Sequence, residues 1–302
     1  MDAPGGPGGS DGDAFTSRTG RHQRGIRNRK ECQQAYSHAE GGRDGSRPPF
    51  SKAGKSLEQV LAAYLKRKGK EAASGLAVEK LAKAAKKKPE DQDTIDVLVD
   101  WGDLIPEVTP YLETDAVAGA TEFLTERGIA EDSDIWTKVL DEARQMARER
   151  GAELVGKRIT DKGEIVDNPD ARYAITETTR ENLRELISKS VDEGWTTTEL
   201  QHNILQSEDF SAARALNISR TESMYAYNHG KHEAAKGTGQ KFKQSFPGEG
   251  CCEECQENAD AGLIPIDEDF PSGDDCPPFH PACRDGIGYS EAKDESESEG
   301  EE

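Results

Sequence analysis

The sequence contains no long apolar run, and no apolar stretch follows its first residues. We therefore predict neither a transmembrane helix nor a secretory signal, and no membrane among the partners. Hydrophobic residues make up 33% of the chain, which is below the usual share in a wholly globular protein. We expect that part of the chain does not pack into a core.

The sequence also lacks the G-x-S-x-G, P-loop and H-E-x-x-H motifs of common catalytic sites. We therefore predict that the protein is not an enzyme. One alternative, a zinc-supported nuclease or toxin-like enzyme, rests on His229 and His232, which share a helix face and could bind a metal. Their polar neighbours favour a solvated helix end instead. Arg220 and Glu222, earlier on the same helix, are interpreted as an internal ion pair or a clamp, not as a catalytic pair.

Cysteine is scarce and unevenly placed, since five of the six cysteines lie between positions 251 and 283. Cys252 and Cys255 form a C-x-x-C pair, and His280 and Cys283 form an H-x-x-C pair. Two short ligand pairs separated by a loop have the spacing that structural zinc requires. We predict a zinc ion held by Cys252, Cys255, His280 and Cys283. Because four ligands leave no open position on the ion, we expect a structural role for it.

Two cysteines in this stretch are surplus, Cys251 and Cys276, and Cys276 could replace His280 as the fourth ligand. Free or paired thiols are the alternative to a metal, because adjacent cysteines also suit redox chemistry. Between the two ligand pairs, apolar residues alternate with Gly262 and Pro265, which predicts a hairpin over GLIPIDEDF. The acidic DEDF element lacks the spacing of a calcium loop, so we interpret its charges as solubilising that hairpin.

Charge is divided unequally along the chain, whose formal net charge is -20. Residues 1–88 hold 19 basic and 9 acidic residues, whereas the remainder holds 20 basic and 50 acidic residues. A basic first third can contact nucleic acid or an acidic protein surface, while the acidic body should repel DNA phosphates. A solvated helix face is the alternative interpretation of the lysine-rich part.

Helical periodicity extends from Ser56, where a capping box with Gln59 is predicted, to about Gly237. We expect this first helix to continue through the lysine runs before Pro89. Further helices are predicted over 93–105, 110–128 and 134–156, then one ending at Gly194, one capped by Thr196 and Glu199, and one over 209–237. KFKQSF, at 241–246, is the first good strand signal.

The predicted fold class is mainly α, with a helical array followed by a small zinc-stabilised α+β carboxyl-terminal knob and disordered termini. The expected organisation is a disordered basic arm over 1–54, a helical region over 55–130, a further domain over 131–289 with the zinc knob at 241–289, and an acidic disordered tail over 290–302.

The element PPFHPACR, following a C-x-x-C pair and DEDF, resembles the carboxyl-terminal signature of the phage Mu F-like minor head proteins, also called phage head morphogenesis proteins. ISRTESMYAYNHG is similar to the I-A-R-T-E helix of that family, and DKGEIVDNPDARYAITETTRENLRELI and EGWTTTEL are similar to its middle region. The resemblance spans roughly 136–289. Family members often read C-R-C, whereas Asp285 follows Arg284 here, which removes one candidate ligand.

The resemblance implies a structural virion protein of the minor capsid class. Such a protein acts near the portal vertex in capsid assembly and in DNA packaging or ejection. The implied partners are the portal protein and the major capsid or scaffold protein, with packaged DNA as a further partner of the basic first third. The implied location is the virion, at the capsid interior or portal vertex, after assembly in the host cytoplasm.

Overall fold

The computed structural model describes residues 56–74, 101–171 and 174–291. Within these ranges it contains seven α-helices and two small sheets, so the predicted mainly helical fold with a small carboxyl-terminal sheet region is confirmed. No helix in the described ranges combines the length and apolar character needed to cross a membrane. The predicted arm, the lysine-rich continuation of the first helix, most of the helix at 93–105 and most of the acidic tail lie outside the described residues.

Helix α2 (Leu57–Ala72) begins as its sequence predicts. The Gln59 amide donates to Ser56 Oγ at 3.3 Å, and the Ser56 amide donates to Gln59 Oε1 at 3.2 Å, which completes the capping box. The apolar face of the helix is buried, with Leu61, Tyr64 and Leu65 at 1% exposure or less. The capping box and the buried apolar face therefore both form as the sequence predicts.

The next helix corrects two of the predicted boundaries. Pro106 was expected to end a helix, but it lies in the first turn of α5 (Ile105–Glu126), after a short 3-10 turn, η1 (Gly102–Leu104). A proline suits that position because the first N–H groups of a helix have no intrahelical acceptor. The helix predicted to start at Pro110 thus begins five residues earlier, and Pro110 lies inside it.

Helix α6 (Asp134–Glu153) follows the predicted pattern, with Ser133 as its cap. The stretch after it was not predicted to form a helix or a strand. It is instead an antiparallel hairpin of β1 (Lys157–Ile159) and β2 (Ile165–Asp167), with Gly163 at a φ of 79°. Strands of three residues are too short to produce a clear alternation in the sequence.

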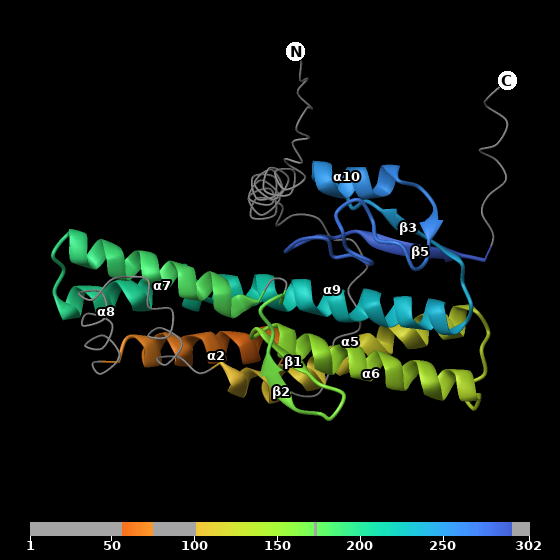
Figure 1. The fold of residues 1–302 in the computed structure, drawn as a ribbon, viewed down its shortest axis with the longest axis horizontal. Helices are drawn as coiled ribbons and strands as arrows, with labels where there is room; N and C mark the ends of the chain where they lie inside the picture. The colour runs from red at the N-terminus through yellow and green to blue at the C-terminus, as the bar shows by residue number, and fades with distance from the viewer. Residues whose placement is uncertain (1–55, 75–100, 172–173, 292–302) are drawn as a thin grey trace, which may run out of the picture.

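Helices α7 (Ile175–Asp192) and α8 (Thr197–Gln206) form one end of the molecule (Figure 1). The predicted capping box of Thr196 and Glu199 is confirmed, because each side chain accepts from the other's backbone amide. Together with α2 and the 3-10 turn η2 (Glu208–Phe210), these helices form a separate core cluster: Ala72, Ala73, Leu183, Leu200, Ile204 and Phe210.

Helix α9 (Ala212–Gly237) runs along most of the molecule and packs against α2, α5 and α6 (Figure 1). It contains the R-T-E motif of the sequence. Two glycines, Gly119 of α5 and Gly230 of α9, allow the helix backbones to approach closely. The main core therefore lies around α9, and the carboxyl-terminal knob is built on the same helix.

The knob (residues 241–289) combines β3 (Phe242–Phe246), α10 (Glu253–Asp260), β4 (Ile264–Pro265) and β5 (Gly286–Ser290), which continues one residue beyond it. Its sheet has the antiparallel order β4-β3-β5. The strand predicted from KFKQSF is confirmed. The hairpin predicted over GLIPIDEDF is wrong, because β4 pairs with β3 and the residues after β4 return through a loop.

Candidate metal centre and the pocket beside it

The carboxyl-terminal half of α9 is buried, which corrects the predicted solvated helix end. Asn228, His229 and His232 are 4%, 7% and 0% exposed. The His232 Nδ1 atom lies 3.1 Å from the Tyr289 hydroxyl of β5. The Asp275 carboxylate, from the loop before β5, lies 4.0 Å from His229 Nδ1 and 3.9 Å from His232 Nε2. The covering groups therefore come from residues more than forty positions later in the chain.

Burial keeps both histidines neutral. Desolvation lowers the pKa of His229 to about 4, although Asp275 opposes the shift. Desolvation, together with Lys236 and Lys243, lowers the pKa of His232 to about 2. Neither histidine belongs to a group of three or more closely spaced metal donors in the part of the chain that the structure describes. The pair therefore does not form the metal site that the enzyme hypothesis requires.

We expect these two histidines to make stability fall as the pH is lowered. Their folded-state pKa values lie below the ordinary value of about 6.5, so below that pH the unfolded chain binds protons that the folded protein does not. At pH 5 the loss should be about 2 kcal/mol for each histidine. Urea unfolding at pH 5 and 7.5 measures it. His232→Gln should reduce the difference, and an unchanged pH dependence in that variant would contradict the assignment.

Arg220 and Glu222 of the R-T-E motif were predicted to form either an internal ion pair or a hydrogen-bonding clamp against the knob, but Glu222 pairs with Arg150 of α6. Arg150 Nε donates to Glu222 Oε2 at 2.7 Å, and Nη2 donates to Oε1 at 2.9 Å. Both side chains are about 95% buried. The Arg150 guanidinium also lies 4.4 Å from the centre of the Tyr225 ring, which stacks on His229. The motif thus joins α9 to α6 beneath the knob.

Removing one partner of this pair is expected to destabilise the protein. Arg150→Met should lower the free energy of unfolding by about 3–5 kcal/mol, because it leaves the Glu222 carboxylate buried without its partner. Thermal melting followed by circular dichroism measures the loss. Arg144→Met on the exposed part of α6 is the matched control, since its ion pair with Asp141 is at the surface and should contribute less than about 1 kcal/mol. Equal effects of the two substitutions would contradict this prediction.

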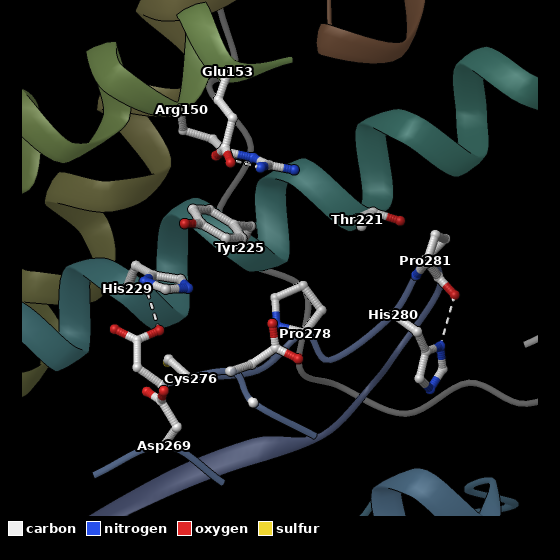
Figure 2. A pocket seen from close by; sticks show the side chains of 13 residues that line it. Arg150, Glu153, Thr221, Tyr225, His229, Asp269, Cys276, Pro278, His280 and Pro281 are labelled. Carbon is white, nitrogen blue, oxygen red and sulfur yellow. Dashed lines mark hydrogen bonds and ion pairs between the residues drawn. The ribbon is translucent and has the colours of Figure 1, made fainter. Parts of the chain in front are cut away.

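A pocket of about 260 Å³ lies between α6, α9 and the loop before β5. Figure 2 shows Arg150, Tyr225 and His229 on the helices, with Asp269, Pro278 and His280 on the knob. Its lining includes four carboxylate residues: Glu153, Asp269, Asp274 and Asp275. Among the described lining residues, Arg150 is the only cation, and it is already bonded to Glu222. Such a lining repels the phosphates of nucleic acid.

The predicted zinc ligands come from α10 and from the loop before β5, and the structure brings them close together. His280 Nε2 lies 3.3 Å from Cys252 Sγ and 3.1 Å from Cys255 Sγ. Cys255 Sγ lies 3.8 Å from Cys283 Sγ. A tetrahedral zinc ion with bonds of about 2.3 Å to sulfur and 2.0 Å to nitrogen would separate two sulfurs by ~3.8 Å and a sulfur from a nitrogen by ~3.5 Å. The spacings within Cys252, Cys255 and His280, and between Cys255 and Cys283, therefore fit zinc, whereas Cys283 lies outside the compact group formed by the other three donors.

The orientation of His280 also suits a metal ligand. Its Nδ1 lies 2.9 Å from the Pro281 carbonyl oxygen. A carbonyl oxygen only accepts hydrogen bonds, so the ring nitrogen that faces it must carry a proton. The proton is therefore assigned to Nδ1, and the lone pair of Nε2 faces the two sulfurs, as in many zinc sites. The Ala282 amide donates to Thr221 Oγ1 of the R-T-E motif at 3.0 Å. Thr221 thus fixes the H-x-x-C turn on α9.

Burial and protonation of the thiols bear on metal binding. The hydrogen bond with Cys283, together with burial, raises the pKa of the Cys255 thiol. A thiolate at Cys255 therefore requires a compensating positive charge, which a metal ion supplies. The surplus cysteines lie outside the donor groups that contain Cys252, Cys255, His280 and Cys283. Cys276 is buried and lines the pocket, whereas Cys251 is half-buried and its thiol points to Gln256 Oε1.

One site residue was missed by the sequence interpretation. Asp285 follows the H-x-x-C turn and is 2% exposed. One carboxylate oxygen of Asp285 lies within 4.8 Å of the sulfurs of Cys255 and Cys283. Asp285 stands at the position where family members often have a second cysteine after Arg284. That position was the signal in the sequence that Asp285 could be a metal ligand.

Residues 181–286 match the family model described as phage Mu protein F like protein. The chain carries a phage Mu F-like segment. The resemblance predicted from its motifs is therefore confirmed, although the match is shorter than the predicted span and begins within α7. No curated protein and no solved structure matches the chain.

The phage Mu F-like segment (residues 181–286) includes α8, α9 and almost the whole knob up to the first residue of β5. It therefore contains the R-T-E motif, all four predicted zinc ligands and Asp285. The family suggests a structural protein of phage head morphogenesis that interacts with other capsid components. The helices α2, α5 and α6, which cover the other side of α9, lie outside the match.

Proposed function

We propose that this protein is a minor head protein of the virion that acts near the portal vertex during capsid assembly and in DNA packaging or ejection. The main support is the phage Mu F-like match, which covers nearly all of the knob and the whole helix that carries it, together with α8 and part of α7. The portal protein and the major capsid or scaffold protein are its proposed partners. The protein resides in the virion and reaches it from the host cytoplasm.

The knob is proposed as a rigid docking head stabilised by a structural zinc centre. Its own hydrophobic cluster contains four buried residues, Cys255, Phe270, Phe279 and Cys283, of which two are metal donors. So small a core does not supply the free energy to fix a fold. Zinc binding contributes ~10–16 kcal/mol in small zinc modules. Cys252, Cys255, His280 and Cys283 are the donors of the proposed centre.

The division of charge supports a second contact. The basic first third is proposed to contact packaged DNA or an acidic neighbour, while the acidic remainder keeps away from the phosphates. The helical body separates the two contacts and acts as a spacer. Binding to DNA should therefore weaken as salt is raised. It should fall more when the five lysines of 80–88 are replaced by glutamine than when residues 1–54 are deleted, because 1–54 hold 9 basic and 6 acidic residues whereas 55–88 hold 10 and 3.

Co-expression with the portal and major capsid proteins tests the docking role. The wild type should co-purify with at least one of them, and Cys252→Ser and Cys283→Ser should lose the interaction. Cys276→Ser is the matched control, because Cys276 is a buried cysteine of the same loop that lies outside the donor groups. The proposal fails if the wild type captures neither protein, or if the donor variants bind as well as the control.

A nuclease is the second candidate, because the pocket contains His229 beside Asp275. The four carboxylates of its lining argue against phosphate binding without added metal. Incubating the purified protein with plasmid DNA, with and without Mg²⁺, Mn²⁺ or Zn²⁺, distinguishes the candidates. No cleavage is expected. Cleavage that His229→Ala abolishes would replace the structural proposal with an enzymatic one.

A further inference from the structure

The metal donors of the knob fall into two groups that share one sulfur. The first group contains Cys252, Cys255 and His280, and the second contains Cys255, Cys283 and Asp285. Within each group all donor atoms lie within 4.8 Å of one another. Cys283 does not join the first group, whereas the ligands of a single tetrahedral zinc lie no more than ~3.8 Å apart. The donors therefore form two compact sets that share Cys255, and each set is small enough to hold one ion.

The environment of Asp285 suits a cation once the neighbouring thiols lose their protons. Its Oδ1 accepts a hydrogen bond from the Gly248 amide at 3.0 Å, its Oδ2 is buried, and the carboxylate interacts with the Cys255 thiol only while that thiol is protonated. The carboxylate is near two sulfurs, which repel it when they are thiolates. Buried carboxylates are stable when they are paired or when they coordinate a metal. A cation between Asp285 and the sulfurs would remove both costs.

The charges of the donors can be compared with the charge of one or two divalent ions. When the centre is metallated, the thiolates of Cys252, Cys255 and Cys283 and the carboxylate of Asp285 carry four negative charges, and His280 is neutral. One divalent ion leaves two negative charges in a mostly buried site, whereas two divalent ions leave none. Uncompensated charge in such a site costs several kcal/mol. One zinc ion with four thiolates carries the same residual charge in ordinary structural sites, so charge permits one ion, and a second ion would neutralise what remains.

We propose that the knob holds two zinc ions that share the Cys255 thiolate. Cys252 and His280 complete the protein donors of the first ion, and Cys283 and Asp285 complete those of the second. Each ion then has three protein donors, and a water molecule or a partner residue would take its fourth position. This inference rests on the zinc centre in the proposed function, and it adds Asp285 as a metal ligand. A carboxylate and thiolates are both ordinary ligands of zinc, so the mixed donor set suits that ion.

Native mass spectrometry of the full chain, purified with zinc under reducing conditions, counts the ions directly. The wild type is expected to carry two zinc ions, and Asp285→Asn is expected to carry one, because the amide keeps the shape of the side chain but loses its charge. Asp267→Asn is the matched control, since Asp267 is exposed on the same loop and belongs to neither group. It should retain two ions.

The outcomes separate this inference from the function on which it rests. A wild type with one zinc ion overturns the two-ion centre and leaves the structural zinc intact, whereas a wild type with none overturns both. Two ions in a folded Asp285→Asn variant also overturn the inference, since Asp285 is then not required. The melting temperature of the helical body shows whether the variant is folded.

A second variant protects the test against a failure of Asp285→Asn to fold. Asp285→Cys should retain two ions, because a thiolate replaces the carboxylate as donor. With cobalt in place of zinc, its sulfur-to-metal charge-transfer absorbance should rise by about a quarter, because four metal–sulfur bonds become five. An absorbance equal to that of the wild type would show that position 285 does not contact the metal, and the proposal would fail.

Discussion

Alanine at Gly119 or at Gly230 is expected to destabilise the helical body more than any other single methyl addition to it. A Cβ atom at Gly119 would lie 2.0 Å from the Tyr227 carbonyl oxygen, and one at Gly230 would lie 2.0 Å from the Ala116 carbonyl oxygen. Both obstacles are backbone atoms of the opposite helix. Because a backbone cannot move aside as a side chain can, α5 and α9 would have to separate.

We expect each substitution to cost about 3 kcal/mol or more, at the upper end of the range for overpacked cores, despite the better helix propensity of alanine. Gly69→Ala is the matched control, because its Cβ would meet the Phe210 ring, a side chain, at 2.8 Å. Chemical unfolding of the three variants measures the difference. The double variant should cost less than the sum of the singles, since one separation relieves both clashes. A Gly230→Ala variant as stable as Gly69→Ala would contradict the close crossing.

Local signals in the sequence predicted the helices well. The capping boxes at Ser56 and Thr196 and the apolar faces that follow them depend on residues three or four apart, so the same contacts form in the structure. The C-x-x-C and H-x-x-C pairs are equally local. Their joint position could be anticipated because each pair fixes its own turn.

Contacts between distant segments could not be predicted in this way. The end of α9 has polar residues and was interpreted as solvated, but β5 and the loop around Asp275 cover it. The burial of Lys243 of β3 likewise depends on a distant segment and could not be predicted. The side chain is fully buried, and its ammonium group donates to the Asp275 carbonyl oxygen at 2.7 Å, so the alternation of KFKQSF places its polar residues inside and leaves Phe246 exposed.

The interaction partners of buried charged residues also could not be predicted from the sequence. Arg220 and Glu222 are neighbours along α9, but the buried Glu222 carboxylate forms its ion pair with Arg150 of α6. Asp285 was counted as the loss of a ligand, because the resemblance supplied a cysteine there and the sequence does not say where a carboxylate points. The structure places it beside Cys255 and Cys283, where it can act as a donor itself.

Removing the metal is expected to unfold the centre of the knob and to leave the helical body folded. The body has its own large core around α5, α6 and α9, whereas the buried members of the knob cluster, among the described residues, are two phenylalanines and two donor cysteines. Without the ion, residues 251–285 should lose backbone protection against hydrogen exchange by about a thousand-fold or more, since the metal supplies most of their stability.

Hydrogen exchange followed by mass spectrometry, with and without a zinc chelator in reducing buffer, tests this expectation. Cys255→Ser should reproduce the effect without chelator, because Cys255 belongs to both donor groups, and Cys276→Ser should keep the protection. Strand β5 should respond less than α10, since the Tyr289 ring packs edge-on against Phe123 of α5 and its carbonyl accepts from Arg127. If the metal-free protein kept residues 251–285 protected, the knob would be stable through its packing on α9, and a structural metal would not be needed.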